Sequence, residues 1–323
     1  MSLPGSTFLK RLKLLRYNRF VGLAFLTLEK YTGFPREKKR FLQKKGYKPN
    51  LTEPLTLSEK LMWKKIHDRN PILPVTADKF RARSYLEEVL GPDRAAEILI
   101  PLLYATDRPE TIPYEELPDR FIVKANHASG FNMVVDKKVN RKEEVINYCR
   151  GWLKMYYGLY KNEWAYVNIK PMVIIEKLLL DQEGSLPKNY KFFMFHRNCR
   201  YIRIANNLKD LPSSSYTPEW HYLPLLEKGK KGPEVERPKR LEEMLDLART
   251  LSNHLDFVRV DLYYLGDKIF FSELTHYPNS AKLKIPYCLD LELGQYLNLA
   301  PGYWQKGNTR DLAAKFNEGD YDW

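Results

Sequence analysis

Residues Phe257–Asn279 read FVRVDLYYLGDKIFFSELTHYPN, and this pattern predicts a β-hairpin. Two runs rich in aromatic and β-branched residues, Phe257–Tyr264 and Lys268–Glu273, flank the turn residues Leu265-Gly266-Asp267. Strands that are joined by so short a turn are antiparallel. The hairpin therefore indicates an α+β protein with antiparallel sheets, unlike the strand–helix alternation of a Rossmann domain.

The hairpin also carries three charged residues that predict a chemical site. Arg259 and Asp261 are two residues apart and share one face of a strand, and Glu273 ends the partner strand, within reach of Asp261. Two convergent carboxylates repel unless a cation lies between them, and their oxygens suit Mg²⁺ that carries nucleotide phosphates. The arginine would neutralise charge that develops in phosphoryl or acyl transfer. An ordinary Arg–Asp salt bridge is the alternative that these residues alone leave open.

The remaining sequence predicts helices and strands that agree with this α+β class. Periodicity and capping residues indicate helices at Leu57–Asp68 (with Thr56 and Ser58 as caps), from Thr76 to Gly91-Pro92, at Lys142–Tyr157 and at Leu241–Leu255. Branched residues indicate strands at Ile98–Leu103, Arg120–Ala125, Met133–Val135, Met172–Leu178, Tyr190–Phe195 and Tyr201–Ile204. The stretch Leu211–Pro238, with its prolines, serines and the basic run Lys228–Lys231, is expected to be a long loop.

Composition and charge narrow the class of protein without identifying it. The 323 residues suffice for one large domain or two packed lobes. Lys and Arg number 53 against 40 acidic residues, and the net charge of +13 favours polyanionic partners, with a generally basic solvated surface as the alternative. The cysteines Cys149, Cys199 and Cys288 form no CxxC pair, which argues against a disulfide framework or a zinc site and favours a reducing, cytoplasmic compartment.

The N-terminal segment has the order of charges and apolar residues of a signal peptide but lacks its other features. A basic stretch, Lys10–Arg19, precedes the apolar run Phe20–Leu28, yet no small-residue cleavage site follows. The run is also too short to span a bilayer as a helix. We expect an amphipathic basic helix that packs on the body of the protein; a helix that rests on an anionic membrane is the alternative.

A second candidate element is the stretch Phe121–Asn132, FIVKANHASGFN. A strand delivers Lys124, and a short polar turn with Ser129 and Gly130 follows. Backbone amides in such a turn can bind phosphate oxygens while the lysine supplies a point charge. No GxxxxGK[ST] or GxGxxG pattern occurs, so an ordinary hairpin turn stays open as the alternative.

A third candidate element is the apolar strand Val173–Leu180, VIIEKLLL, which Glu176 interrupts. That carboxylate could lie beside an adenine or ribose, and exposed backbone there could offer hydrogen bonds to the base. The alternative is an edge strand with Glu176 and Lys177 facing solvent.

Taken in order, these elements resemble the TupA-like ATP-grasp family. The phrases that carry the resemblance are LTLSEKLMWKKIHDRNP, ADKFRAR, FIVKANHASG, NYKFFMF and FVRVDLY…FFSELTHYP. The resemblance runs from about Leu55 to Leu297, and the ordered set is specific although each phrase alone is weak. The family is associated with teichuronopeptide and other cell-surface polysaccharide biosynthesis.

The resemblance implies a nucleotide role for one group of residues. Lys79 and Lys124 would contact the ATP phosphates, and the turn with His127, Ser129 and Gly130 would close over them. Adenine and ribose would be held by Glu176, Lys177 and the backbone near Leu178.

For the hairpin, the resemblance implies a magnesium site and a catalytic set. Asp261 and Glu273 would bind Mg²⁺, while Arg259 would stabilise a tetrahedral oxyanion, with Lys191 and His276 as further catalytic residues. The usual E-x-N ending is replaced by Glu273-Leu274-Thr275, so Thr275 or Asn279 would supply the missing oxygen ligand.

The resemblance also implies a domain organisation. Two α+β lobes with antiparallel sheets would sandwich ATP behind a helical N-terminal region. We expect that helical, basic region at residues 1–95, the lobe with the phosphate loop at 96–178, and the lobe with the metal and catalytic end at 179–323.

The expected activity is that of an ATP- and Mg²⁺-dependent carboxylate–amine ligase acting through an acylphosphate. It would modify a cell-surface polysaccharide or its precursor with an amino acid, on an acidic small-molecule or glycan substrate. One alternative is a kinase that phosphorylates a sugar or glycan hydroxyl; another is a non-catalytic module that binds nucleic acid or anionic membrane. We expect no specific nucleic-acid partner, a cytoplasmic protein, and peripheral contact with the inner face of the membrane through the basic N-terminus.

Overall fold

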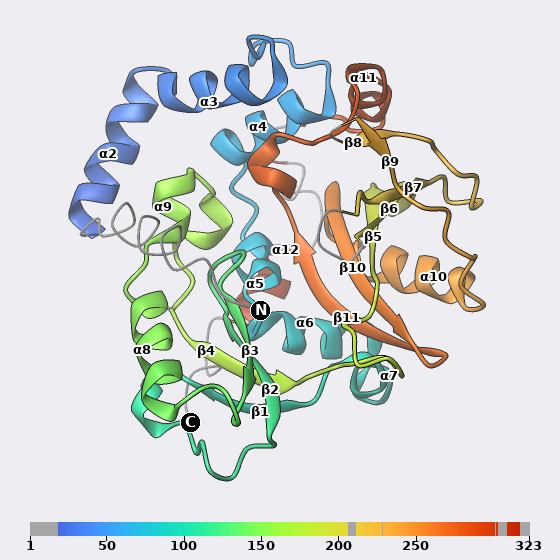
Figure 1. The fold of residues 1–323 in the computed structure, drawn as a ribbon. Helices are drawn as coiled ribbons and strands as arrows, with labels where there is room; N and C mark the ends of the chain where they lie inside the picture. The colour runs from blue at the N-terminus through green and yellow to red at the C-terminus, as the bar shows by residue number, and fades with distance from the viewer. Residues whose placement is uncertain (1–18, 206–210, 228, 301, 303–308, 317–323) are drawn as a thin grey trace. The chain divides into compact units, whose positions relative to one another are not determined.

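The computed structural model describes residues 19–205, 211–227, 229–300, 302 and 309–316 (Figure 1). The predicted N-terminal basic stretch up to residue 18, and Lys228 of the predicted basic run, lie outside these residues. The chain divides into two compact units. Unit 1 comprises Met1–Lys48 and Pro101–Leu178, and unit 2 comprises Pro49–Ile100 and Leu179–Trp323. All three sheets in the described residues are antiparallel, which confirms the predicted α+β class.

Unit 1 is a small antiparallel sheet packed against a helix. Its elements are α2 (Arg19–Tyr31), α3 (Pro35–Lys45), β1 (Leu102–Thr106), η1 (Pro109–Thr111), β2 (Arg120–Ala125), β3 (Asn132–Asp136), α8 (Lys142–Leu153), α9 (Tyr157–Lys161), η2 (Trp164–Tyr166) and β4 (Val173–Lys177). The sheet order is β1-β4-β2-β3. Alternate residues of β2, such as Phe121 and Val123, are fully buried in one core with Cys149 and Trp152 of α8. The opposite face of β2 carries Lys124.

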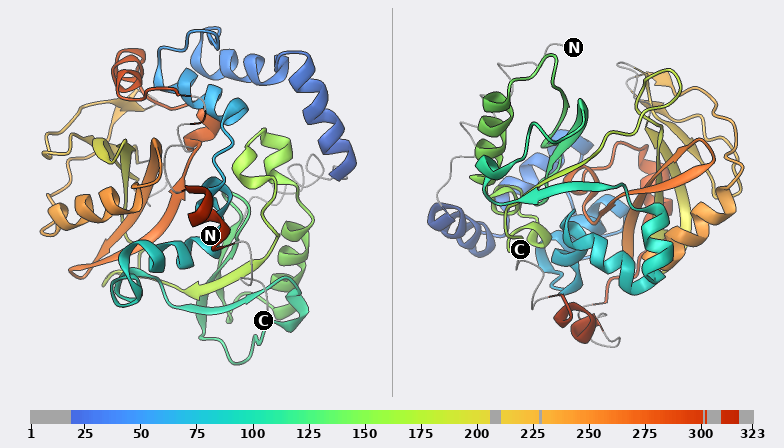
Figure 2. Two further views of the ribbon diagram at one scale, coloured as in Figure 1. Left: turned by 180° about the vertical axis from the view of Figure 1, so that it is seen from behind. Right: turned by 90° about the horizontal axis from the view of Figure 1, so that it is seen from below.

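Unit 2 is built on a larger antiparallel sheet. Its elements are α4 (Leu57–His67), α5 (Ile72–Ala77), α6 (Arg81–Leu90), α7 (Pro92–Ile98), β5 (Asn189–Phe195), β6 (Asn198–Ala205), β7 (Ser214–Tyr216), β8 (Leu226–Glu227), β9 (Lys230–Lys231), α10 (Leu241–Leu251), β10 (Phe257–Leu265), β11 (Lys268–Thr275), η3 (Pro278–Ala281), α11 (Tyr287–Gln295) and α12 (Thr309–Ala314). The strand order is β11-β10-β5-β6-β7, and α10 contacts β5, β6 and β10 (Figure 2). The predicted hairpin therefore forms one edge of this sheet.

Helix α4 begins with a reciprocal cap. The hydroxyl of Thr56 accepts a hydrogen bond from the amide of Glu59, and the carboxylate of Glu59 accepts one from the amide of Thr56. This capping box satisfies two amides that the first helical turn leaves without partners. The predicted cap at Thr56 is therefore confirmed, whereas the amide of Ser58 binds the carboxylate of Asp290 instead.

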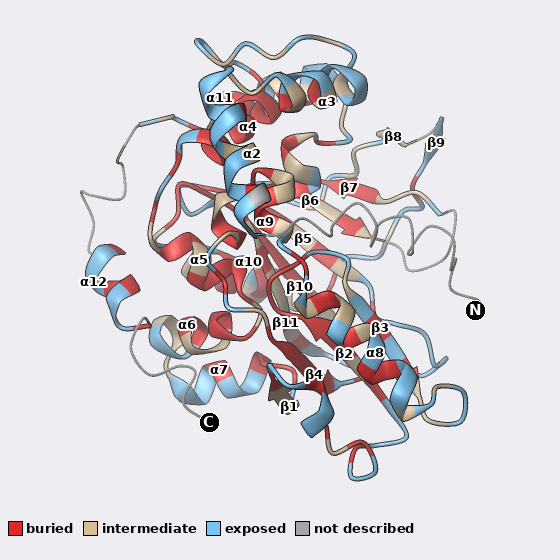
Figure 3. Ribbon diagram, turned by 90° about the vertical axis from the view of Figure 1, so that its left-hand side faces the viewer, coloured by how far each residue is buried: buried red, intermediate tan, exposed pale blue. Residues whose placement is uncertain are grey.

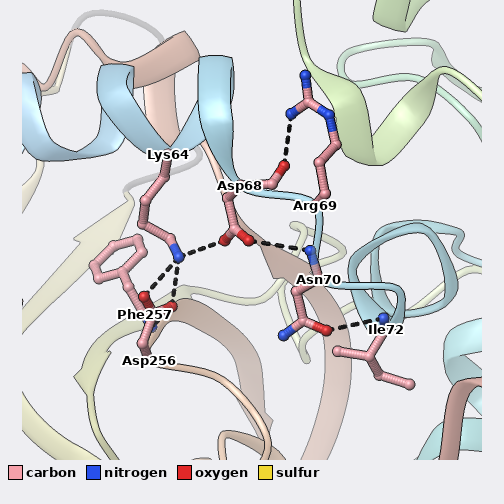
Figure 4. Close-up of polar contacts among 7 residues, drawn as sticks. All are labelled: Lys64, Asp68, Arg69, Asn70, Ile72, Asp256 and Phe257. Atoms are coloured by element: carbon pink, nitrogen blue, oxygen red, sulfur yellow. Dashed lines mark hydrogen bonds and ion pairs between the residues drawn. The ribbon is translucent and has the colours of Figure 1, made fainter. Parts of the chain in front are cut away.

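A buried ion cluster joins α4 to the start of β10 (Figure 4). The ammonium of Lys64 lies 2.5 Å from the carboxylate of Asp68 and 2.6 Å from that of Asp256, and all three side chains are buried. Asp68 also accepts the amide of Asn70, and Asp256 accepts the amide of Phe257. The cluster thus ties the end of α4 to the residue that precedes the hairpin.

Several predicted boundaries are wrong for identifiable reasons. The single helix expected from Thr76 to Gly91 is broken, because the carboxylate of Asp78 accepts the amides of Phe80 and Arg81 and so competes with helical hydrogen bonds. The strand expected to start at Ile98 starts at Leu102, since Pro92 opens α7. The expected loop Leu211–Pro238 contains the short strands β7, β8 and β9.

The N-terminal region is divided between the two units. The sequence favoured one helical region at residues 1–95, yet residues up to Lys48 belong to unit 1 and Pro49–Ile100 belong to unit 2. In unit 2, α5 and α7 contact β11, and α4 contacts α11, so this segment packs directly on the hairpin's own unit. None of the described helices has the length and apolar character needed to cross a membrane.

Candidate functional site

The register of the β10–β11 hairpin brings the predicted charged residues together. Asp261 pairs directly with Glu273, and Arg259 pairs with Thr275. The register shifts between Asp261 and Leu262, which marks an irregularity in the ladder beside the two carboxylates. On its other side β10 pairs with β5, where Lys191 lies opposite Asp261. Cross-strand neighbours are close enough for their side chains to interact, so five polar residues meet at one place.

These side chains form a continuous polar network, the hairpin cluster (Arg259, Asp261, Glu273, Thr275 and Lys191). The guanidinium of Arg259 donates to both oxygens of Asp261, at 2.6 and 2.7 Å, and also to Glu273 at 3.1 Å and Thr275 at 3.0 Å. The hydroxyl of Thr275 donates to Glu273 at 3.1 Å, and the ammonium of Lys191 donates to Asp261 at 3.1 Å. The Arg–Asp salt bridge considered from the sequence is present, but as part of a larger cluster.

Positive charge dominates the surroundings of Glu273. Burial alone would raise the pKa of this carboxyl, but the charges of Lys79, Arg259 and Lys191 outweigh burial and lower the pKa to about 2. Glu273 is therefore ionised at neutral pH. Three cations around two carboxylates leave a net positive charge, which suits a ligand that carries phosphate groups.

Lys79 reaches this cluster from a distant part of the sequence. It lies between α5 and α6, directly after Asp78, whose carboxylate shapes the break between the two helices. Helix α5 contacts β11, which brings this break to the hairpin. The structure thus brings together Lys79 and the hairpin residues, as the resemblance implies for the phosphate and metal ends of a nucleotide site.

The donor set of the hairpin cluster fits a hard divalent cation. Asp261, Glu273 and Thr275 offer only oxygen atoms, and Mg²⁺ binds in proteins through one or two carboxylates with the remaining positions filled by phosphates and water. Within the described part of the chain no group of three or more His, Cys, Asp and Glu residues is placed so that it could hold a metal ion. Glu273 is 29% exposed whereas Asp261 is fully buried, and a cation would therefore meet Glu273 first.

Two further predicted residues, Asn279 and His276, lie outside the hydrogen bonds of this cluster. Thr275, and not Asn279, hydrogen-bonds to Glu273; Asn279 begins a run of left-handed residues with Ser280 and Ala281, at φ 52°, 55° and 63°. Such a run is costly for residues with a Cβ and is found where surrounding structure holds it.

His276 is buried and links the hairpin to α5. Its Nε2 lies 2.8 Å from the hydroxyl of Thr76, and that hydroxyl donates to the carbonyl of Ile72. This contact ties the imidazole to α5. Burial and the charge of Lys64 lower the pKa of His276 to about 3, so the ring is neutral. The contact with Thr76 fixes the position of the His276 ring between β11 and α5.

A second polar pair lies on the sheet of unit 1. The ammonium of Lys124 is 2.6 Å from the carboxylate of Glu176, and both side chains are largely buried. In the register Ile122 lies opposite Glu176 and Lys124 lies opposite Ile174, so the two charged residues are diagonal neighbours on one face. Strand β4 lies between β1 and β2, and the edge-strand alternative for Glu176 is therefore wrong. Only Lys177 faces solvent.

The turn after β2 is fastened by a residue that the sequence did not single out, Asn126. This fully buried side chain accepts the amide of Met172 at 2.8 Å and donates to the carbonyl of Lys170 at 2.9 Å. It also lies 3.1 Å from Nδ1 of the buried His127. A polar residue directly after a buried strand was the signal that could have identified it.

The tip of this turn is open. Ser129 and Gly130 are exposed, and a Cβ built on Gly130 would meet nothing within 4 Å. The φ of +79° at Gly130 is the reason for glycine, because other residues rarely adopt it. The turn therefore has the exposed backbone that a phosphate-binding loop requires. At the end of β4, Leu178 is buried, and the amide of Lys177 donates to the carbonyl of Pro101 at 3.0 Å.

Comparisons with known proteins agree with the resemblance seen in the sequence. The model of the family described as TupA-like ATPgrasp matches residues 59–298, more than half of the chain. A search of curated protein sequences found no match. Among solved structures, the chain is similar to the D-alanine–D-alanine ligase of Helicobacter pylori, at 17% identity and a TM-score of 0.43, covering 75% of this chain and 69% of that one.

Two further similar structures carry ligase names. The D-alanine–D-alanine ligase of Bacillus anthracis is 13% identical with a TM-score of 0.44, covering 79% of this chain and 76% of that one. The ATP-grasp ligase PsnB, complexed with a minimal precursor, is 10% identical with a TM-score of 0.38, covering 74% and 68%.

Proposed function

Because the chain belongs to the TupA-like ATP-grasp family, we propose that it is an ATP- and Mg²⁺-dependent carboxylate–amine ligase. The observation that carries the proposal is the hairpin cluster, whose carboxylates at Asp261 and Glu273 face Arg259 and Lys191 of the cluster and the nearby Lys79. ATP would transfer its terminal phosphoryl group to a carboxylate, giving an acylphosphate and ADP. An amine would then displace phosphate and form the amide.

The residues of unit 2 have roles that follow from their charges. Asp261 and Glu273 would hold Mg²⁺, with Thr275 as the further oxygen ligand, and the bound ion would neutralise charge on the phosphates. Lys79 would bind a phosphate oxygen. The guanidinium of Arg259 donates a hydrogen bond to the hydroxyl of Thr275. In the reaction it would donate to the oxyanion that develops at the carboxyl carbon of the substrate.

The residues of unit 1 have roles in nucleotide affinity. Lys124 would bind phosphate oxygens, and the exposed backbone of Ser129 and Gly130 would add amide donors. Glu176 and the backbone near Leu178 would hold ribose and adenine. These residues would bind ATP and would not take part in the chemical step. Their variants should therefore change the dissociation constant for ATP more than the turnover rate.

We predict that Lys124→Ala weakens ATP binding. The loss of one charge-assisted hydrogen bond corresponds to about 1.5–3 kcal/mol, or roughly 10- to 100-fold in the dissociation constant. Isothermal titration calorimetry with Mg-ATP measures the effect directly. Arg120→Ala is the matched control, because Arg120 lies on the same strand but is exposed and pairs with Asp136. Equal ATP affinity of the Lys124 variant and the unaltered protein would refute the assignment.

The net charge of the protein and its family suggest which molecule accepts the amino acid. A net charge of +13 favours an acidic glycan or small molecule, and the family suggests a cell-surface polysaccharide or its precursor as the molecule that receives an amino acid. Such a precursor and ATP meet in the cytoplasm, where we place the protein.

An assay of ADP release across amino acids and uronic acids, with mass spectrometry of the products, tests the proposed activity. We expect an amide, ADP and phosphate in equal amounts, and no turnover without Mg²⁺. A phosphoester with ADP alone would show a kinase. ATP binding that does not depend on Mg²⁺, together with steeply salt-dependent DNA binding, would show a binding module instead.

A further inference from the structure

Helix α2 exposes a row of apolar side chains along one face. Phe20, Leu23, Leu28 and Tyr31 are 79%, 39%, 58% and 86% exposed. Their spacing of three to five residues places them on one side of a helix, here called the apolar stripe. Figure 3 marks much of α2 as exposed. Isolated apolar residues are common on protein surfaces, but a continuous helical stripe indicates a binding surface.

The opposite face of α2 is held firmly within unit 1. A Cβ on Gly22 would lie 2.8 Å from Leu159 of α9, so glycine allows the two helices to approach closely. The guanidinium of Arg36 stacks on the ring of Phe25 at 4.2 Å and donates to the carbonyl of Tyr160. The helix therefore packs on the body with one face, as the sequence favoured, and presents the apolar stripe with the other.

The exposed charged side chains of α2 and α3 have one sign. Lys38, Lys39 and Lys44 of α3 are exposed, as are Arg19 and Lys30 of α2. The acidic residues of the segment 19–45, Glu29 and Glu37, are both buried. The exposed surface of α2 and α3 therefore combines an apolar stripe with uncompensated positive charge.

We propose that α2 and α3 bind the surface of an anionic lipid bilayer. An amphipathic helix with a basic border lies in the interface plane, with its apolar residues at the boundary of headgroups and acyl chains. The described part of α2 has 13 residues and is about 20 Å long, against a hydrocarbon core of roughly 30 Å, and its apolar stripe runs along one side as in a helix that lies along the surface. The positive charges disfavour a second copy of the chain as the partner and favour lipid phosphates.

Such binding would bring the protein to substrates held at a membrane. It does not depend on the proposed ligase activity, because it involves neither the hairpin cluster nor Lys124.

Vesicle co-sedimentation of the full chain tests the proposal. We expect binding to vesicles of phosphatidylcholine with phosphatidylglycerol, little binding to phosphatidylcholine alone, and release by salt. Lys38→Gln with Lys39→Gln should weaken binding about 25-fold, since each lysine near an anionic surface contributes about fivefold. Leu28→Ser with Tyr31→Ser should weaken it at least tenfold.

The matched control is Lys138→Gln with Val139→Ser, an exposed basic and apolar pair elsewhere in unit 1. This variant should bind vesicles like the unaltered protein, and all variants should keep its thermal unfolding midpoint. Equal binding to both vesicle types, or an equal loss in the control, would overturn the proposal. So would a lipid-free dimer in sedimentation velocity that Leu28→Ser with Tyr31→Ser dissociates, because a second copy would then cover the apolar stripe.

Discussion

Glu273→Gln is expected to lower the turnover of ATP by at least about 100-fold while the protein stays folded. The substitution keeps the size of the side chain but removes the charge through which it would hold Mg²⁺. Several kcal/mol of charge stabilisation depend on that ion, and each 1.36 kcal/mol corresponds to about tenfold in rate. The lowered pKa of Glu273 means that its charge also contributes to stability, so some loss of stability is expected; because Glu273 is partly exposed and the amide can be hydrated, this loss should be smaller than for the fully buried Asp261. ADP release and urea unfolding measure the two effects separately.

Glu227→Gln is a closely matched control for this experiment. Glu227 is 23% exposed in unit 2 and forms a 2.6 Å ion pair with Arg203, so its burial and pairing resemble those of Glu273. It has no place in the hairpin cluster, and its variant should keep full turnover. If Glu273→Gln kept full turnover as well, the magnesium assignment would be wrong.

Asp261→Asn is expected to stop turnover too, but it is a less clean test. Asp261 is fully buried and accepts two hydrogen bonds from the Arg259 guanidinium as well as one from Lys191. Neutralising it removes a buried negative charge that these two cations face, which destabilises the fold in addition to removing a ligand.

Lys64→Met is expected to destabilise the protein by about 3–5 kcal/mol, because it removes the ammonium that lies between the buried carboxylates of Asp68 and Asp256. Urea unfolding at neutral pH measures the loss. Lys315→Met is the control: Lys315 pairs with Glu88 at the surface, where such pairs contribute about 0–1 kcal/mol. A loss below about 1 kcal/mol for Lys64→Met would show that the buried cluster does not hold α4 on β10.

The pH dependence of this effect has a defined sign. Burial alone would lower the pKa of Lys64, but the charges and hydrogen bonds of Asp256 and Asp68 outweigh burial and raise the pKa above its ordinary value of 10.5. A raised lysine pKa stabilises the folded state fully below the unfolded value, and this contribution is lost as the pH rises through the folded value. The difference between the unaltered protein and Lys64→Met should therefore be constant near neutrality and shrink only above about pH 10.5.

Local signals in the sequence were sufficient to predict the strands that carry the candidate site. The strand Arg120–Ala125 was predicted with its observed bounds, and the hairpin was predicted around Gly266, which adopts a positive φ of 55° in the turn. Because a short turn sets the register of a hairpin, the approach of Asp261 and Glu273 followed from the spacing. Whether these residues bind magnesium and nucleotide stays a prediction.

Local signals in the sequence could not predict contacts between residues that are far apart in the chain. Nothing near Val173–Lys177 indicates that β1 pairs with β4 on one side and β2 on the other, so Glu176 was open to an edge-strand interpretation. The contact of His276 with Thr76 could not be foreseen either, because the two residues are 200 positions apart; the catalytic role assigned to His276 stays a prediction. Asn126 was overlooked because its partners, Lys170 and Met172, are distant in sequence.

The sequence by itself determined the α+β class, the family and the antiparallel hairpin with its charged face, since periodicity, turn residues and ordered motifs are local properties. Only the tertiary structure decided that Lys79 and Lys191 lower the pKa of Glu273, that Asp261 is buried, and that α2 shows its apolar side to solvent. Burial and electrostatic environment depend on which segments pack together, and packing of distant segments is not encoded in any single stretch of the chain.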